Sequence, residues 1–172
     1  MNKKIAIFGH RKVDEADKHI IKDVNNLFEN FVINDDTQFL FGSNSEFNDI
    51  CYDIVTELKG KYNNIERIGY LCATEIAFTK EEAINYQKYI NKSISKGKHI
   101  KIYDQIQQLD FDSKNLYIDR NKKMIEDADI CIFYYSEKNI NPTNKFGNKT
   151  NSGTKIALEY AKSKCKEIII LN

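Results

Sequence analysis

Short apolar runs alternate along this chain with longer segments whose apolar residues recur at helical spacing. The short runs are typical of buried strands, and they occupy residues 4–8, 37–41, 66–72, 99–103, 129–135 and 167–171. Apolar residues three and four positions apart predict amphipathic helices from residue 16 onward and over 45–60, 80–95, 116–128 and 152–164. In the third helix we expect the inward positions to be Ala83, Tyr86, Ile90 and Ile94. Gly60 and Gly97 are placed to end the second and third helices.

Buried strands that alternate with amphipathic helices are typical of a mainly parallel sheet with helices on both faces. We therefore predict an α/β fold, a Rossmann-like three-layer α/β/α sandwich whose mainly parallel sheet has about five to six strands. The chain shows no repeat and no linker, so we expect a single domain over residues 1–172. The polar segment 136–151 contains the only proline and is predicted to be a long loop.

Composition narrows the choice of partner. The net charge is +1, from 26 basic and 25 acidic residues. A dedicated nucleic-acid binder usually has a basic excess, because each neutralised phosphate needs a Lys or Arg, so we do not expect nucleic acid as the partner. One short stretch, 138–149, is locally basic.

The chain also lacks the features of exported and membrane proteins. No apolar run approaches the roughly 20 residues that span a bilayer, and the N-terminus leads directly into the first strand instead of a signal core. Four scattered cysteines, with no C-x-x-C pair, favour reduced core or near-core thiols: Cys51, Cys72, Cys131 and Cys165. We expect a cytoplasmic protein without membrane contact.

Ligands of parallel sheets bind beyond the carboxyl ends of the strands, so the loops after the strands hold the candidate chemistry. The first such loop is Gly9, His10 and Arg11. Glycine allows a tight turn, and the other two side chains offer donors for phosphate or ribose. The alternative is a plain turn with an exposed arginine.

The second loop joins the second strand to the clearest helix and consists of Gly42, Ser43, Asn44, Ser45 and Glu46. Small residues there leave backbone N–H groups free for an anion, which the helix dipole also favours. Asn44 or Ser45 is placed to cap the helix. Glu46 is either a solvent-facing acid of the first turn or an acceptor for ribose hydroxyls.

Two further segments complete the candidate site. Ser152, Gly153 and Thr154 precede the last helix and could form an anion-binding nest, or simply an N-cap. Arg120 and Asn121 lie early in the helix before the strand at 129–135, where the arginine is either a charge partner for the ligand or solvated.

Several familiar sites are absent from the sequence. There is no G-x-G-x-x-G fingerprint and no G-x-x-x-x-G-K-[ST] phosphate loop. His10, His19 and His99 lie far apart in sequence, without metal-ligand partners at useful spacing, so we expect neither a metal nor a cofactor. Tyr134 and Tyr135 end the strongest strand, where one could stack on a base while at least one packs in the core.

Four blocks of the chain together resemble one superfamily. They read FGHR at 8–11, FLFGSNSEF at 39–47 with TELK at 56–59, DRNKKMI at 119–125 with DICIFYY at 129–135, and NSGTKIALEYA at 151–161. This pattern is similar to the SLOG superfamily (SMF/DprA and LOG), and within it to a branch of small bacterial and phage proteins. The resemblance covers essentially the whole chain and is weakest between about residues 73 and 113. It implies a Rossmann-like fold with a nucleotide-type ligand at the loops described above.

The superfamily resemblance implies more than one activity. LOG proteins cleave the N-glycosidic bond of nucleoside monophosphates, and their signature is an Arg followed by a Met and then P-G-G-x-G-T-x-x-E. Arg120 and Met124 match the first part, and only residues 152–154 match the second. Ala157 stands where the signature has its Glu, and Glu159 lies two residues further on, about 200° around a helix.

Three hypotheses follow from the residues and the resemblance. The first is a binding module for a nucleotide derivative, because other SLOG domains bind NAD-derived signalling nucleotides, often in anti-phage systems. The second is an N-glycoside hydrolase, with Glu46 and Arg120 as the candidate catalytic residues. The third is a DNA-associated protein like DprA, which binds single-stranded DNA. Many relatives of the fold dimerise, so the resemblance also implies a homodimer.

Overall fold

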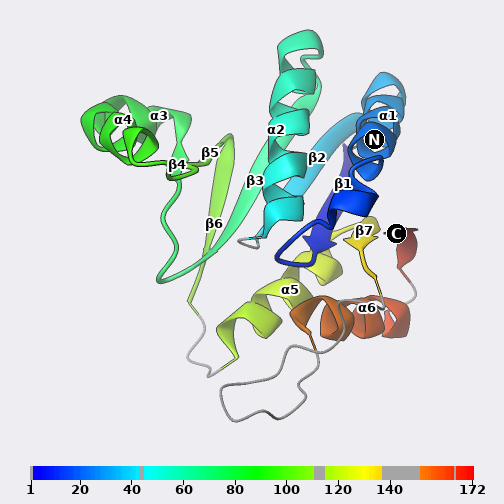
Figure 1. Cartoon of the computed structure of the whole chain (residues 1–172). Coiled ribbons are helices and arrows are strands. Elements are labelled where there is room, and N and C mark those ends of the chain that lie inside the picture. Colours follow the sequence, from blue (N-terminus) through cyan, green and yellow to red (C-terminus); the bar gives the residue numbers. More distant parts are fainter. Residues whose placement is uncertain (1, 43–44, 111–114, 137–151, 165) are drawn as a thin grey trace.

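The computed structural model describes residues 2–42, 45–110, 115–136, 152–164 and 166–172. Within these residues, one sheet of six parallel strands lies between two layers of helices (Figure 1). The predicted three-layer α/β/α architecture with a parallel sheet is therefore confirmed. The polar segment 137–151, predicted as a loop, lies outside the described residues.

The strand order places the middle of the sheet at β1. The six strands are β1 (Asn2–Gly9), β2 (Asp36–Phe41), β3 (Ile65–Cys72), β6 (Gln105–Leu109), β7 (Ile130–Tyr134) and β8 (Glu167–Leu171). Their order across the sheet is β6-β3-β2-β1-β7-β8. Ile5 of β1 pairs with Phe39 of β2 on one side and with Ile130 of β7 on the other. The order therefore reverses between β1 and β7, which is the topological switch point of the sheet.

Alternate residues of the strands supply the two cores. On one face Ile5 and Ile7 pack against α1 (Ile20–Asn34) and α2 (Glu46–Lys61). On the other face Ala6 and Phe8 pack against α5 (Leu116–Asp127) and α6 (Gly153–Ser163). Because successive side chains of a strand point to opposite faces, a strand apolar at every position needs a helical layer on each side.

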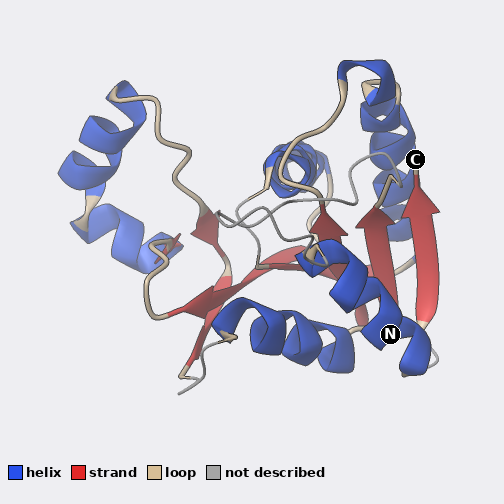
Figure 2. Ribbon diagram, turned by 60° about the horizontal axis from the view of Figure 1, so that its bottom comes forward, coloured by secondary structure: helices blue, strands red, loops and turns tan. Residues whose placement is uncertain are grey.

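A small unit of two helices and two short strands is inserted between β3 and β6, and we call residues 73–104 the insertion. It contains β4 (Phe78–Thr79), α3 (Lys80–Asn85), α4 (Gln87–Ser95) and β5 (Ile102–Tyr103). Phe78, Ala83 and Ile90 form its own small core, which is separate from the two cores of the main sheet. Figure 2 shows this unit beside the main sheet.

The insertion is where the sequence predictions needed correction. The helix predicted over 80–95 is two helices that meet at Tyr86, and Tyr86 and Ile94, which were expected to face inward, are 54% and 56% exposed. The strand predicted over 99–103 is only the two residues of β5, which pair with β4 and not with the main sheet. The polar edge strand β6 was not predicted. Gly60 lies inside the last turn of α2, which ends at Lys61.

The structure also bears on the cysteines and on membrane-spanning helices. Cys51, Cys72 and Cys131 are free and buried, while Cys165 lies outside the described residues. None of the helices in the described part of the chain is long and apolar enough to cross a bilayer.

Candidate functional site

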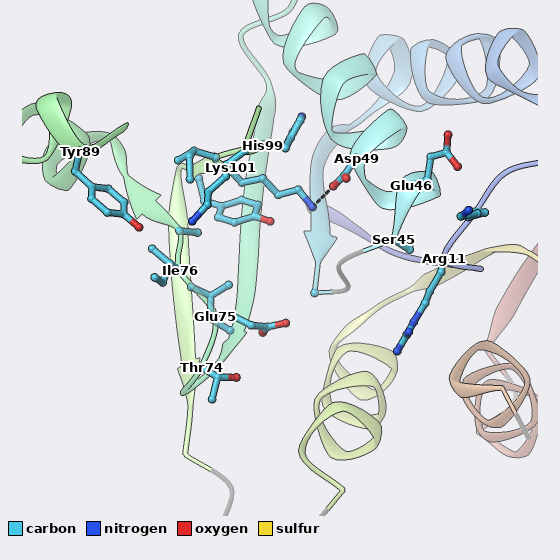
Figure 3. A pocket seen from close by; sticks show the side chains of 17 residues that line it. Arg11, Ser45, Glu46, Asp49, Thr74, Glu75, Ile76, Tyr89, His99 and Lys101 are labelled. Carbon is cyan, nitrogen blue, oxygen red and sulfur yellow. Dashed lines mark ion pairs between the residues drawn. The ribbon is translucent and has the colours of Figure 1, made fainter. Parts of the chain in front are cut away.

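A cavity of about 700 Å³ opens at the carboxyl edge of the sheet, between the first turn of α2 and the insertion (Figure 3). Its size falls within the roughly 300–1,000 Å³ typical of small-molecule sites. One wall comes from the loops after β1 and β2, through Arg11, Lys12, Gly42 and Ser45. The other wall comes from the end of β3 and from the insertion.

The α2 wall combines a capped helix N-terminus with two exposed cations. The side chain of Ser45 caps α2 and accepts a hydrogen bond from the backbone N–H of Asn48 at 3.2 Å. Arg11 and Lys12 are exposed, and no carboxylate in the described part of the chain forms an ion pair with either. The N-terminal end of the helix dipole adds further positive potential here.

Glu46 holds the loop after β1 against α2. Its Oε2 accepts a hydrogen bond from the backbone N–H of Val13 at 2.9 Å, and its own N–H donates to the carbonyl of Arg11 at 3.0 Å. In Figure 3 its carboxylate points away from Glu75 and Lys101 on the other side of the cavity. Glu46 thus fixes the position of Arg11, and its carboxylate is already engaged.

An ion pair and a histidine–carboxylate contact connect the insertion to α2 beside the cavity. Lys101 Nζ lies 2.6 Å from Asp49 Oδ1, the pair dashed in Figure 3, and His99 Nε2 lies 3.1 Å from Asp53 Oδ1. Tyr52 of α2 adds two hydrogen bonds at this junction. Its hydroxyl accepts from the N–H of Ile102 at 2.7 Å and donates to the carbonyl of the same residue at 2.8 Å. The insertion wall therefore has a fixed position relative to α2.

The base of the insertion is held by a charged cluster around Asp104. Its carboxylate accepts hydrogen bonds from the backbone N–H of Arg67 at 2.9 Å and from Arg67 Nε at 3.3 Å, and it lies near the ammonium groups of Lys59 and Lys80. Burial alone would raise the pKa of Asp104. The hydrogen bonds from Arg67 and Lys80 and the charges of Arg67 and Lys59 outweigh that effect, and the pKa is lowered.

Arg120 and Glu75 form a buried ion pair under the loop after β2. Arg120 Nη1 lies 2.6 Å from Glu75 Oε1, and Arg120 is only 2% exposed. Glu75 Oε2 accepts from the backbone N–H of Cys72 at 2.8 Å, which fixes the carboxylate at the end of β3. Arg120 Nε has no hydrogen-bond partner among the described residues. Glu75 lines the cavity directly, whereas Arg120 lies behind it.

His10 occupies the switch point as a buried, neutral ring. The backbone N–H of Ser136 donates to its Nε2 at 3.2 Å, and the ring lies against Tyr134 and Tyr135 at centroid distances of 5.9 and 5.4 Å. Burial lowers the pKa of His10. Tyr134 is fully buried, stacks on Phe47 and donates its hydroxyl to Asp17 at 2.7 Å. Burial and that hydrogen bond raise the pKa of Tyr134 to about 12.

The structure brings only some of the sequence-derived site residues together. Four of them line the cavity: Arg11, Gly42, Ser45 and Glu46. Seven others lie elsewhere: Gly9, His10, Arg120, Asn121, Ser152, Gly153 and Thr154. Ser43 and Asn44 lie outside the described residues. The cavity is thus centred on the loop after β2 and on the insertion.

The residues around the last helix have structural roles. Ser152 caps α6, and its Oγ accepts from the N–H of Lys155 at 3.1 Å. Ala157 is buried in the core shared with α5, and Glu159 is exposed. No carboxylate of α6 therefore takes the place of the Glu in the LOG signature.

Sequence reasoning missed Glu75, Tyr89, Lys98 and Lys101, which line the insertion side of the cavity. All four belong to the part of the chain where the family resemblance is weakest. The only local signal is the short basic run Lys96–Lys101, which is interrupted by Gly97.

Comparison with known proteins supports the fold alone. No family model matches the chain, and no curated protein resembles it. Among solved structures, the chain is similar to the X-ray structure of TM1055, a structural genomics target, with a TM-score of 0.58 and 12% sequence identity. The likeness covers 96% of this chain and 72% of that one. At this identity the two proteins share a Rossmann-like architecture.

Proposed function

We propose that this protein binds a nucleotide or a nucleotide-derived anion in the cavity between α2 and the insertion. The observation that carries the proposal is a cavity of about 700 Å³ at the carboxyl edge of a parallel sheet, lined by Arg11 and Lys12, which have no ion-pair partner among the described residues. Ligands of open α/β sheets bind at this edge. The SLOG-like sequence blocks point to the same class of ligand, including the NAD-derived nucleotides that some SLOG domains bind.

The phosphate end of the ligand is placed at the α2 wall. Arginine and lysine side chains beside a helix N-terminus form a common phosphate-binding arrangement, since their charges and the helix dipole both favour an anion. The N–H groups of Glu46 and Asn48 are bonded to the Arg11 carbonyl and to Ser45, so the two cationic side chains supply the main contacts. Glu46 supports this wall by holding the backbone of Arg11 and Val13.

Titration calorimetry and thermal unfolding with AMP, NAD and ADP-ribose test the proposal. A bound nucleotide at about 100 times its Kd would stabilise the fold by roughly 2.7 kcal/mol. We expect Lys12→Ala to weaken binding several-fold, whereas Lys22→Ala, which removes an equally exposed lysine on α1, should leave it unchanged. The absence of both binding heat and thermal stabilisation with all three nucleotides would exclude this function.

The ion pair between Arg120 and Glu75 favours a second candidate function, hydrolysis of an N-glycosidic bond. Such a reaction needs a carboxylate that stabilises the oxocarbenium-like centre or activates water. Glu75 lines the cavity, and Arg120 and the N–H of Cys72 hold its carboxylate in place. Glu46 lines the opposite wall, with its carboxylate bound to the N–H of Val13.

Release of free base from nucleoside monophosphates and NAD, followed by chromatography, tests this second function. If the protein is a hydrolase that uses Glu75, Glu75→Gln abolishes turnover and Glu46→Gln retains most of it. The reverse pattern would assign the role to Glu46. Nucleotide binding without any release of base would leave the binding function alone.

A further inference from the structure

The two walls of the cavity differ in chemistry. The α2 wall presents the cations Arg11 and Lys12. The opposite wall presents an aromatic ring and aliphatic side chains of the insertion, namely Tyr89, Ile76, Ala77 and Ile100. Large apolar side chains exposed inside a cavity are a mark of a binding surface, because water is their only other neighbour.

Tyr89 is the aromatic side chain of the insertion that lines this wall. It is 42% exposed, its ring makes an edge contact with Phe78 at a centroid distance of 6.1 Å, and its hydroxyl points toward the cavity (Figure 3). Phe78 belongs to the small core of the insertion, so this contact ties the partly exposed ring of Tyr89 to that core.

Several polar side chains of the insertion wall are already paired, including Glu75, which is bound to Arg120. Lys101 pairs with Asp49 and His99 pairs with Asp53, and both pairs tie the insertion to α2. Lys98 is exposed at the same rim and adds positive charge there. What the insertion offers a ligand is therefore mainly an aromatic and aliphatic surface.

We infer that the insertion is the base-recognition element of the site, with Tyr89 stacking on the purine or pyrimidine ring of a nucleoside phosphate whose phosphate lies at the α2 wall. This inference rests on the proposed function and specifies its ligand, a molecule that is anionic at one end and planar and apolar at the other. A ring that stacks on an aromatic side chain gains affinity without much base selectivity, since every base has a π-face.

Calorimetric titrations with pyrophosphate, ribose 5-phosphate and AMP distinguish the contribution of the α2 wall to binding from that of the insertion wall. The wild-type protein should bind AMP more tightly than ribose 5-phosphate. Tyr89→Ala should weaken AMP binding by roughly 5- to 100-fold, the range for the loss of one base–aromatic stack. The same variant should leave pyrophosphate and ribose 5-phosphate binding within about twofold of wild type, since neither ligand has a base to stack.

Tyr86→Ala is the matched control. Tyr86 is a neighbouring exposed tyrosine that also packs on Phe78, at 5.2 Å, but it does not line the cavity. We expect this variant to bind AMP like the wild type. An equal loss in both variants would show that they disturb the insertion core, and the inference would be wrong.

Two further outcomes distinguish base stacking on Tyr89 from nucleotide binding in the cavity. If Lys12→Ala weakens AMP binding while Tyr89→Ala does not, the nucleotide site stands and the base platform is refuted. If the wild-type protein binds AMP no more tightly than ribose 5-phosphate, the inference is wrong, whereas the proposed function fails only if AMP, NAD and ADP-ribose all fail to bind.

Discussion

Gly42 is the residue at which the cavity wall meets the buried Arg120. A Cβ added there would lie 2.5 Å from Met124 Sδ, a distance that packed atoms do not adopt, and 3.0 Å from both Cδ and Nε of Arg120, which is tight. Gly42→Ala should therefore displace Met124, press on Arg120 and destabilise the fold by about 1–3 kcal/mol, the usual cost of overpacking. Urea denaturation measures this change.

Gly153 provides the comparison for that substitution. It is the first residue of α6, and a Cβ added there meets no atom of the described residues within 4 Å. Gly153→Ala should leave the free energy of unfolding unchanged or raise it slightly, because alanine restricts the unfolded chain. Equal destabilisation by the two substitutions would contradict the packing argument at Gly42.

His10 makes stability depend on pH. Its pKa is lowered by burial, so the folded protein favours the neutral ring, while the unfolded chain protonates near pH 6.5. The stabilising contribution is complete above pH 6.5 and is lost as the pH falls toward the lower pKa of the folded state. The wild type should be less stable at pH 5.5 than at pH 7.5.

A variant isolates this effect from the titration of other groups. His10→Phe keeps an aromatic ring between Tyr134 and Tyr135 and removes the titration, so its loss of stability between pH 7.5 and 5.5 should be smaller than that of the wild type. The same drop in both proteins would exclude His10 as its source.

At the scale of elements, the insertion depends on the cluster around Asp104. Asp104→Asn removes the charge that faces Arg67, Lys59 and Lys80 and should cost about 1–3 kcal/mol at pH 7, the range for hydrogen bonds to charged groups. Asp53→Asn, which removes only an exposed partner of His99, should change stability by less than about 1 kcal/mol.

The stability difference between the wild type and Asp104→Asn should depend on pH, because the pKa of Asp104 is lowered in the folded protein. A carboxyl group whose folded pKa is depressed stabilises the fold above its unfolded pKa of about 3.9 and loses this contribution as the pH falls through the folded value. Unfolding free energies of wild type and Asp104→Asn should therefore converge below about pH 4. A constant difference down to pH 2.5 would show that the carboxylate charge is not the cause.

The elements that could be predicted from sequence are those buried on two faces. β1 and β7 are apolar at nearly every core position, which is typical of buried strands. α2 has both an apolar stripe and a capping serine, which together predict a helix and its first residue. β6 was missed because it is an edge strand whose residues Gln105, Gln107 and Gln108 face solvent. The helix over 80–95 was predicted unbroken because helical spacing continues across Tyr86, where the backbone turns.

At the scale of the whole molecule, topology predicted the correct edge of the sheet but not the place of the cavity along it. Among the described residues, the switch point between β1 and β7 is filled by His10 and Tyr134, and the cavity lies instead beside the ends of β2 and β3. The insertion creates that cavity by forming its second wall. Glu75 and Tyr89 could not be predicted as site residues, since their partners Arg120 and Phe78 are brought to them only by the fold.

This two-part construction predicts two levels of stability in one chain. Among the described residues, the core of the insertion contains three buried apolar side chains, whereas β1 and β7 lie inside the six-stranded sheet. Small units with few buried contacts open before the global fold does. In hydrogen exchange followed by mass spectrometry, amides of residues 78–103 should exchange faster than those of β1 and β7.

Tyr52→Phe tests whether the insertion opens as a separate unit. The substitution removes the hydroxyl that bonds both the N–H and the carbonyl of Ile102, at a cost of about 1–3 kcal/mol. Exchange in the insertion should then accelerate by roughly 5- to 100-fold with little change in β1 and β7. Tyr62→Phe, which removes only a bond to Glu29 at the other end of α2, should leave the insertion unchanged. Equal acceleration of β1, β7 and the insertion in Tyr52→Phe would mean that the cavity's two walls unfold together as one cooperative structure.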